Sequence, residues 1–231
     1  MPPTRTEKQK MKKRICYIIG AGEPSLPLCL PKREETLVIA ADGGYPLAVR
    51  LFGNPDLAVG DFDSLGYLPE GVKTVTHPRE KDDTDMALAA ELAIADGVGE
   101  LVILGALGGR LDHTVANLQL LVSLAARGVR TTLVGADGVA VTALVGGECA
   151  LFPATAHGTL SVFAFGGEAV GVTLSGLAYP LADATLTPSR PLGISNELMG
   201  TEAVVGLRAG TLLLFYPYTE EATPTVKKAN V

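Results

Sequence analysis

The sequence predicts an α/β plus all-β protein, in which a mostly parallel α/β sheet domain precedes an antiparallel β-sandwich. In the first half, continuous Val, Ile and Leu runs alternate with helical segments, a pattern typical of a parallel sheet that helices cover on both faces. From about Val139 onward, short β-rich runs are broken by Gly and Pro, and no long helical pattern follows. The expected parts are a disordered basic leader at 1–14, the α/β domain at 15–138, the sandwich at 139–222 and a frayed tail at 223–231.

The elements of the first half are predicted from apolar runs and from the residues that end them. Strands are expected at 15–22, 36–44, 56–64, 100–109 and 129–138. Two helices are expected among them, at 84–97 and 112–128. Thr84 is a suitable N-cap for the first helix, and Gly97 a suitable stop.

The second half contains the strand-like runs VAVTALV, GTLSVFAF, AVGVTLSGL and EAVVGLRAGTLLLFYPY. One polar segment, GISNELMG at 193–200, follows a Pro-rich loop. Within it Ser195, Asn196 and Glu197 present a hydroxyl, an amide and a carboxylate in a row. The segment is either part of a binding site or a turn before the next strand.

The composition is that of a compact folded protein, because 47% of the 231 residues are hydrophobic and only 19% are charged. No apolar run reaches the ~20 residues of a membrane span. No apolar segment follows the basic start, as a secretory signal would require. The three cysteines, Cys16, Cys29 and Cys149, are odd in number and show no CxxC spacing. We therefore expect reduced thiols in a cytoplasmic protein.

Charge is unevenly distributed along the chain. The net charge is −6, but residues 1–14 hold six Lys or Arg and one Glu, so the remainder carries about −11. The leader is interpreted as a solvated segment, with a nucleic-acid or membrane contact as the alternative. The acidic body argues against binding a phosphate backbone and suits metal ions and cationic substrates. We expect neither a nucleic-acid nor a membrane partner.

Carboxylates recur where strands are expected to end and helices to begin. They are Asp42, Asp61, Asp63, Asp82, Asp85 and Asp112. The carboxyl ends of parallel strands lie along one edge of a sheet, so these segments can converge. Carboxylates brought close together cannot all stay ionised unprotected, and Mg²⁺ is commonly shared between one or two carboxylates and substrate phosphates. The sequence therefore predicts a magnesium site. Each Asp alone can also be a turn former or cap, the interpretation kept for Asp56 and Asp83.

Glycines and basic groups accompany the carboxylates. Gly43, Gly44, Gly108 and Gly109 allow a ligand to approach the backbone closely. The helix start after Gly109 supplies free N–H groups suited to phosphate, and Arg110 and Lys81 can bind phosphate oxygens. His113 is either a ligand contact or a surface group. Asn117 lies five residues past Asp112, a spacing that leaves open whether the two share a helix face. Neither common glycine-rich nucleotide-binding pattern is found.

These motifs together resemble one known family. The motifs are DGG (42–44), GDFDS (60–64), KDDTD (81–85), GGRLDH (108–113) with Asn117, and GISNE (193–197). In this order and at this spacing, from about residue 16 to 216, they resemble the thiamine pyrophosphokinase (thiamine diphosphokinase) family. The resemblance implies a catalytic α/β domain, a thiamine-binding β-sandwich and a homodimer with active sites between subunits. It also implies Mg²⁺-dependent transfer of pyrophosphate from ATP to the hydroxyl of thiamine, giving thiamine diphosphate and AMP.

The resemblance also implies roles for residues at matching positions. Catalytic roles fall to Asp61, Asp63, Asp82, Asp85 and Arg110, and metal binding to Asp42, Asp61, Asp63 and Asp85. ATP binding falls to Gly43, Gly44, Ser64, Lys81, Thr84, Gly108, Gly109, Arg110, Asp112, His113 and Asn117. Thiamine binding falls to Ser195, Asn196 and Glu197. We expect Asp85 to orient or deprotonate the thiamine hydroxyl.

The chain departs from the family at one point, because some members place a C-terminal Trp against the thiamine ring and this chain has no Trp. Tyr216, Tyr218 or Phe215 could substitute, or aliphatic side chains could hold the ring. Two other functions compete with the kinase. A Mg²⁺-dependent nucleotide pyrophosphohydrolase would use the same carboxylates with water, but needs no acceptor domain. A regulator that binds thiamine or nucleotide without turnover would not need so many carboxylates.

Overall fold

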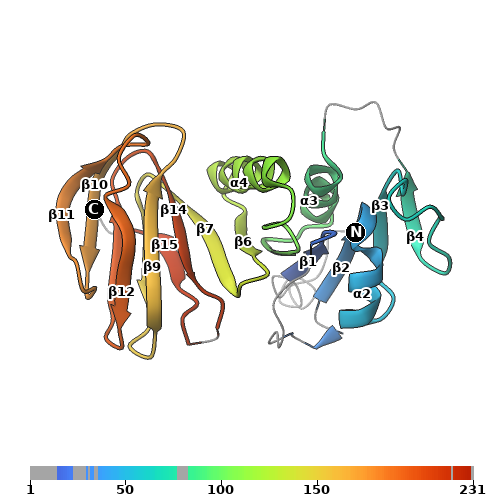
Figure 1. Cartoon of the computed structure of the whole chain (residues 1–231), viewed down its shortest axis with the longest axis horizontal. Helices are drawn as coiled ribbons and strands as arrows, with labels where there is room; N and C mark the ends of the chain where they lie inside the picture. Colours follow the sequence, from blue (N-terminus) through green and yellow to red (C-terminus); the bar gives the residue numbers. More distant parts are fainter. Residues whose placement is uncertain are drawn as a thin grey trace, which may run out of the picture.

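The computed structural model describes residues 15–22, 30, 32–33, 36–76, 83–219 and 221–229. The leader at 1–14, Cys29, Lys81 and Asp82 lie outside the described residues. Within them, an α/β part and a β-sandwich part lie side by side (Figure 1) and share one ten-stranded sheet. A second sheet of five strands completes the sandwich. The predicted fold class, a largely parallel sheet with an antiparallel β-sandwich, is confirmed.

The long sheet has the strand order β12-β9-β14-β7-β6-β5-β1-β2-β3-β4. Its parallel strands are β6 (Arg130–Val134), β5 (Glu100–Leu104), β1 (Ile15–Ile19), β2 (Thr36–Ala41), β3 (Leu57–Gly60) and β4 (Lys73–Thr76). Antiparallel pairing continues through β7 (Val139–Val145), β14 (Thr211–Pro217), β9 (His157–Ala164) and β12 (Gly193–Met199). The sheet therefore changes from parallel to antiparallel between β6 and β7.

Helices cover both faces of the parallel part, as predicted. On one face lie α3 (Asp85–Ala95) and α4 (Leu111–Ala126), whose buried Ala89, Ala93, Leu121 and Leu124 share a core with the strands. On the other face Leu47 and Ala48 of α2 (Tyr45–Phe52) pack with alternate strand residues. The sequence analysis did not predict α2, which is eight residues long and follows a short 3₁₀ turn, η2 (Asp42–Gly44), without a side-chain cap. It also missed the edge strand β4.

The second sheet closes the sandwich. Its order is β11 (Leu181–Leu186), β10 (Ala169–Ser175), β13 (Ala203–Leu207), β8 (Glu148–Phe152) and β15 (Thr225–Lys228), all antiparallel. The two sheets enclose an apolar core in which Phe152 and Tyr216 meet edge to face, 5.6 Å between ring centroids. Burial of such aromatic pairs is a main stabilising contribution in a sandwich.

In the second half, the structure contradicts one expectation, the frayed tail, and excludes one of the two alternatives left open for 193–200. Residues 225–228 are not frayed, because β15 pairs with β8 and Val226 packs against the sandwich core; residues 230–231 lie outside the described part. The segment at 193–200 is not a turn, because β12 pairs with β9 along its length apart from one bulge. In both places, pairing with a distant strand decides a structure that local residue preferences leave open.

Two further features concern the location of the protein. Cys16 and Cys149 are buried free cysteines, and burial raises the pKa of the Cys16 thiol well above its usual range. No helix within the described ranges is long and apolar enough to cross a membrane. The cytoplasmic location stays a prediction.

Candidate active site

A pocket of about 610 Å³ opens beyond the carboxyl ends of β1, β2, β3 and β5. In the sheet, β1 lies between β5 and β2. The strands β2, β3 and β4 follow on one side of β1, and β5 and β6 lie on its other side, so the strand order reverses at β1. Such a switch point is where α/β sheets bind ligands. The pocket lining includes the predicted site residues Asp42, Gly43, Asp61, Asp63, Ser64, Thr84, Asp85, Gly108, Gly109, Arg110, His113 and Asn117. Segments far apart in the sequence thus meet as predicted.

The floor of the pocket depends on close backbone approach between the turns after β1 and β5. Gly20 N donates to Leu104 O at 2.8 Å, and Gly22 N donates to Gly105 O at 3.2 Å. Gly105 has a φ of +69°, and a Cβ there would lie 2.4 Å from Gly22 O. Only glycine fits such a position. From the sequence, Gly20 and Gly22 are expected only as part of the strand at 15–22 and are not assigned to the site.

The Asp-Phe-Asp loop after β3 shows how two carboxylates share one pocket. The strand ends at Gly60, so Asp61 and Asp63 lie in a loop and not side by side on a strand face. Between them Phe62 turns inward into the core with a φ of +56°. Asp63 N donates to Asp61 Oδ1 at 3.1 Å, which tightens the turn. An anchored aromatic therefore holds both carboxylates at the pocket wall.

Three carboxylates form a cluster in which one oxygen of each of Asp42, Asp61 and Asp63 lies within 4.8 Å of the others. Asp42 has the left-handed φ of +43°, and Ser64 Oγ donates to its Oδ2 at 2.6 Å. Its Oδ1 is buried and has no hydrogen-bond partner among the described residues. A buried carboxylate oxygen without a partner is costly. A hard cation would satisfy it, since Mg²⁺ takes oxygen ligands, so the residues present fit a magnesium ion.

The start of α4 forms the cationic wall. Arg110 donates to both carboxylate oxygens of Asp112, from Nε to Oδ1 at 3.2 Å and from Nη2 to Oδ2 at 2.6 Å. This interaction holds the pKa of Asp112 at about 2, below its ordinary value of 3.8. Both groups are exposed, but only Arg110 lines the pocket. Asp112 therefore does not line the pocket itself but is ion-paired with Arg110, which does.

The remaining predicted residues of this half divide between the pocket and its support. Thr84 caps α3 as predicted, since its hydroxyl accepts from Ala87 N at 3.2 Å, and Asp85 follows in the pocket wall. Asn117 is buried in the wall and donates to Ala106 O at 2.7 Å. Gly44 does not line the pocket, and a Cβ there would lie 1.9 Å from Ile19 O, so this glycine permits packing of η2 on β1.

The predicted thiamine residues lie elsewhere. Ser195, Asn196 and Glu197 are on β12, at the opposite edge of the long sheet from the carboxylates. Six strands separate β12 from β2 in the sheet order. With six strands between them, the two are seven strand spacings of about 4.8 Å apart, roughly 34 Å in all. One chain therefore does not bring these two groups together.

Comparisons with known proteins follow this division of the chain. Residues 31–133 match the sequence model described as the thiamin pyrophosphokinase catalytic domain, and residues 149–212 match the thiamin pyrophosphokinase vitamin B1 binding domain. Together the two matches span well over half of the chain. The chain belongs to the thiamine pyrophosphokinase family. It is accordingly a transferase, a thiamine diphosphokinase that forms thiamine diphosphate.

Individual members of the thiamine pyrophosphokinase family agree in sequence and fold. The thiamine pyrophosphokinase of Bacillus subtilis is 29% identical over 187 residues, which cover 78% of this chain and 87% of that protein. Its crystal structure superposes with a TM-score of 0.74 at 26% identity, over 88% of this chain and 98% of that one. The Geobacillus thermodenitrificans structure has a TM-score of 0.72 at 26% identity, over 90% and 99%. The yeast enzyme, at 14% identity, shares the fold with a TM-score of 0.70 over 89% and 87%.

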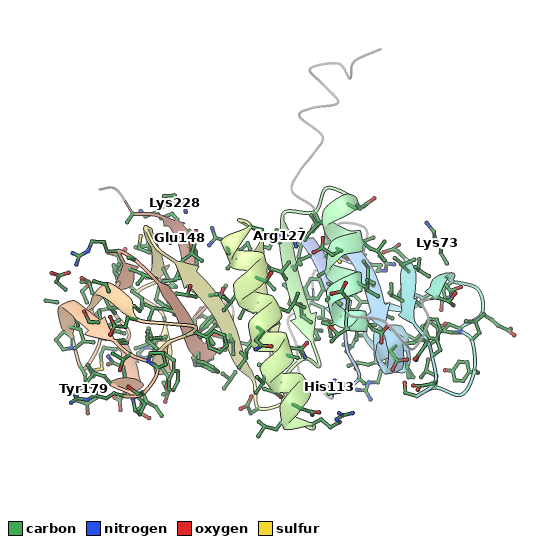
Figure 2. The ribbon with its side chains drawn as sticks, turned by 90° about the horizontal axis from the view of Figure 1, so that it is seen from above. Lys73, His113, Arg127, Glu148, Tyr179 and Lys228 are labelled. Atoms are coloured by element: carbon green, nitrogen blue, oxygen red, sulfur yellow. The ribbon has the colours of Figure 1, made fainter. Side chains whose placement is uncertain are left out.

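The vitamin B1 binding match directs attention to aromatic side chains of the sandwich. Tyr216 is 2% exposed in the sandwich core, so the expectation that it could face thiamine is wrong; its strand alternation turns it inward. Phe215 and Tyr218 are half-buried. Tyr179, which the sequence analysis missed, is 65% exposed. Figure 2 shows Tyr179 and His113 toward the same edge of the molecule, away from Arg127, Glu148 and Lys228.

Proposed function

We propose that this kinase transfers the pyrophosphoryl group of ATP to the hydroxyl of thiamine, giving thiamine diphosphate and AMP, and that it requires Mg²⁺. The observation that carries the proposal is one pocket in which a carboxylate cluster with an unpartnered buried oxygen faces a glycine-rich helix start bearing Arg110. An anion such as triphosphate needs both a cation among the carboxylates and donors opposite them. Residues 15–138 would supply this catalytic site.

Asp42, Asp61 and Asp63 would hold the metal ion, with Asp85 beside them at the start of α3. A bound Mg²⁺ would neutralise charge that develops on the phosphate oxygens. Ser64, whose hydroxyl donates to Asp42, would keep that carboxylate oriented. Asp82 and Lys81 keep the catalytic and phosphate-binding roles that the family resemblance implies.

The chain's own groups would act on both ends of the transferred group. The thiamine hydroxyl oxygen forms a bond to the β-phosphorus of ATP, and the bond from that phosphorus to the α–β bridging oxygen breaks. AMP leaves with the electron pair, and the hydroxyl proton passes to the Asp85 carboxylate. Arg110 and the positive end of the α4 helix dipole stabilise the phosphate oxygens. Gly43, Gly108 and Gly109 leave room for the nucleotide, while His113 and Asn117 form the pocket wall.

The thiamine side would come from a second copy of the chain, in a homodimer whose active sites lie between subunits. The separation of roughly 34 Å between β12 and β2, where the carboxylate cluster begins, supports this arrangement. Exposed apolar side chains occur at both places, Leu111 and Val115 on α4 and Ile194 and Met199 on β12. In the proposed dimer these side chains would be covered at the contact between subunits.

Complementation between variants tests the dimer. An Asp63→Asn variant and a Glu197→Ala variant, each weakly active alone, are co-expressed and compared with each variant purified by itself. In a mixed dimer with shared sites, one site carries both changes and the other carries none, so activity returns. Sites contained within one chain would give no recovery.

Thiamine would be held by Ser195, Glu197 and Tyr179 of the sandwich domain, 139–222. The thiazolium ring carries a fixed positive charge, which suits the exposed Tyr179 ring and the Glu197 carboxylate. Exposed Ser195 has a left-handed φ of +56°, and its N–H donates to Ser161 Oγ at 3.0 Å. The bulge between Gly193 and Asn196 thus sets the direction of this segment.

Product analysis tests the reaction itself. The purified chain is incubated with ATP, Mg²⁺ and thiamine, and products are separated and identified by mass. Equal amounts of thiamine diphosphate and AMP are expected, since attack at the β-phosphorus moves an intact pyrophosphoryl group. Thiamine monophosphate with ADP would instead mean attack at the γ-phosphorus. AMP and pyrophosphate formed without thiamine would indicate the hydrolase, and thiamine binding without turnover would indicate the regulator.

A further inference from the structure

We infer that Asn196 is a positioning residue: it does not contact thiamine itself but fixes the backbone of Tyr179 on the edge of β12 and so places the Tyr179 ring. The inference rests on the proposed thiamine contact of Tyr179. It changes the role that the family resemblance implies for Asn196, and it links two residues that lie seventeen positions apart in the sequence.

The segment that carries Tyr179 crosses from one sheet to the other. After β10 of the second sheet, Leu177 forms an antiparallel bridge with Leu198 of β12, in the long sheet. Ala178 N donates to Glu197 O at 3.2 Å, so the segment continues along the edge of β12. The next residue, Tyr179, is therefore opposite Asn196. Leu177 and Leu198 are both buried, which anchors the crossing in the sandwich core.

At this point the Asn196 side chain takes the place of backbone pairing. Its Oδ1 accepts from Tyr179 N at 2.9 Å, and its Nδ2 donates to Tyr179 O at 2.7 Å. The same Oδ1 accepts from Glu197 N at 2.9 Å. A side-chain amide oxygen has two acceptor positions, so both are in use. With Asn196 only 3% exposed, its oxygen has no capacity left for a ligand.

As a consequence, the Tyr179 side chain is exposed while the Tyr179 backbone is held in place. Both polar backbone groups of Tyr179 are bonded to one buried amide, and Pro180 restricts the residue before it to an extended conformation. A side chain presented from a fixed backbone loses less conformational freedom when it binds a ligand. Asn196 would thus raise thiamine affinity through the placement of Tyr179.

A double-mutant cycle separates positioning from direct contact. We compare three variants, Asn196→Ala, Tyr179→Ala and the double variant. For each, kinetics give kcat and the KM for thiamine, and calorimetry gives the affinity for thiamine. Asn196→Ala is expected to weaken thiamine binding about tenfold with kcat within about twofold. In the Tyr179→Ala background, the second change should have almost no further effect. If the double variant lost affinity by the product of the two single losses, Asn196 would act independently of Tyr179, and the inference would be overturned. An unchanged thiamine affinity in either single variant would also overturn it.

Controls separate positioning from a general loss of stability. Thr142→Val removes another buried hydrogen bond, from Thr142 Oγ1 to Thr131 O at 3.0 Å, inside the long sheet. It should lower the melting temperature without changing thiamine affinity; an equal loss of affinity would count against a specific role for Asn196. Asn196→Asp keeps the oxygen that accepts from Tyr179 and Glu197 but places a second oxygen against Tyr179 O at a buried position, so thiamine affinity should fall at least as far as in Asn196→Ala. Calorimetry reports on the inference even if the reaction products differ from those proposed.

Discussion

The two ends of the long sheet build their functional groups in different ways. At the parallel end, Asp42 in the 3₁₀ turn η2 and Asp61 and Asp63 in a loop lie directly beyond strand ends, and the strand order brings them together. At the antiparallel end, Ser195 and Glu197 stand within an edge strand, and a bulge together with a crossing segment determines where they point. Loops at the carboxyl edge can hold ligands from several strands, whereas an edge strand offers only its own side chains and those of a neighbour. Metal chemistry therefore suits the first end and recognition of an organic ring the second.

The largest effect is expected from the carboxylate cluster. Asp63→Asn keeps the shape of the side chain but removes a charge from the proposed metal site, so thiamine diphosphate formation should fall at least about a hundredfold. Turnover at saturating substrates measures this, with circular dichroism to confirm folding. Asp83→Asn is the matched control, because Asp83 is an exposed carboxylate next to Thr84 that does not itself line the pocket. Full activity in Asp63→Asn would show that the cluster is not the metal site.

A smaller effect is expected from the cationic wall of the same pocket. Arg110→Ala should lower kcat/KM for ATP by about ten- to a hundredfold, because a two-pronged donor to phosphate is lost, while thiamine affinity should stay unchanged. Arg127→Ala is the control at the other end of α4, where Arg127 pairs with Glu91 in a less exposed setting outside the pocket. An equal loss of kcat/KM for ATP in both variants would mean that losing any ion pair on α4 lowers activity and that Arg110 has no specific role.

Two serine hydroxyls test directly whether the two ends act separately. Ser64 supports Asp42 at the parallel end, and Ser161 supports Ser195 at the antiparallel end. Ser64→Ala should raise the Mg²⁺ concentration for half-maximal activity by about tenfold without changing the KM for thiamine. Ser161→Ala should raise the KM for thiamine by a few-fold, roughly the effect of one hydrogen bond, without changing the Mg²⁺ requirement. If each variant altered both quantities, the two ends would not be separable.

More of the parallel end could be predicted from the sequence, for a physical reason. Carboxyl ends of parallel strands converge whatever the loop lengths, so the proximity of Asp61 to Asp42 could be predicted from strand order alone. Local signals also sufficed for Thr84, whose capping depends on the next three residues. The short helix α2 was missed because eight residues with no side-chain cap leave little local pattern.

At the antiparallel end the decisive contacts are distant in sequence. Tyr216 could face the core or solvent until its register with β7 and β9 is known, and the structure turns it inward. The role of Asn196 depends on a segment that leaves the other sheet, which no local pattern encodes. Strand content could thus be predicted here, but the direction of individual side chains could not.

The smallest expected effect concerns the pH dependence of the Arg110–Asp112 pair. Because Arg110 holds the pKa of Asp112 at about 2, against 3.8 ordinarily, any stabilisation from the pair is present above the ordinary value. It is lost as the pH falls through about 2, where the folded-state carboxylate takes up its proton. Titration of the Asp112 carboxyl carbon by NMR should therefore show no change between about pH 5 and 8.

An Arg110→Ala variant should move the midpoint of this Asp112 titration back toward 3.8. Because both groups are exposed, overall stability should barely change between the two proteins. A midpoint near 3.8 in the unaltered chain would mean that the ion pair does not persist in solution and that Arg110 is available to phosphate without first leaving Asp112.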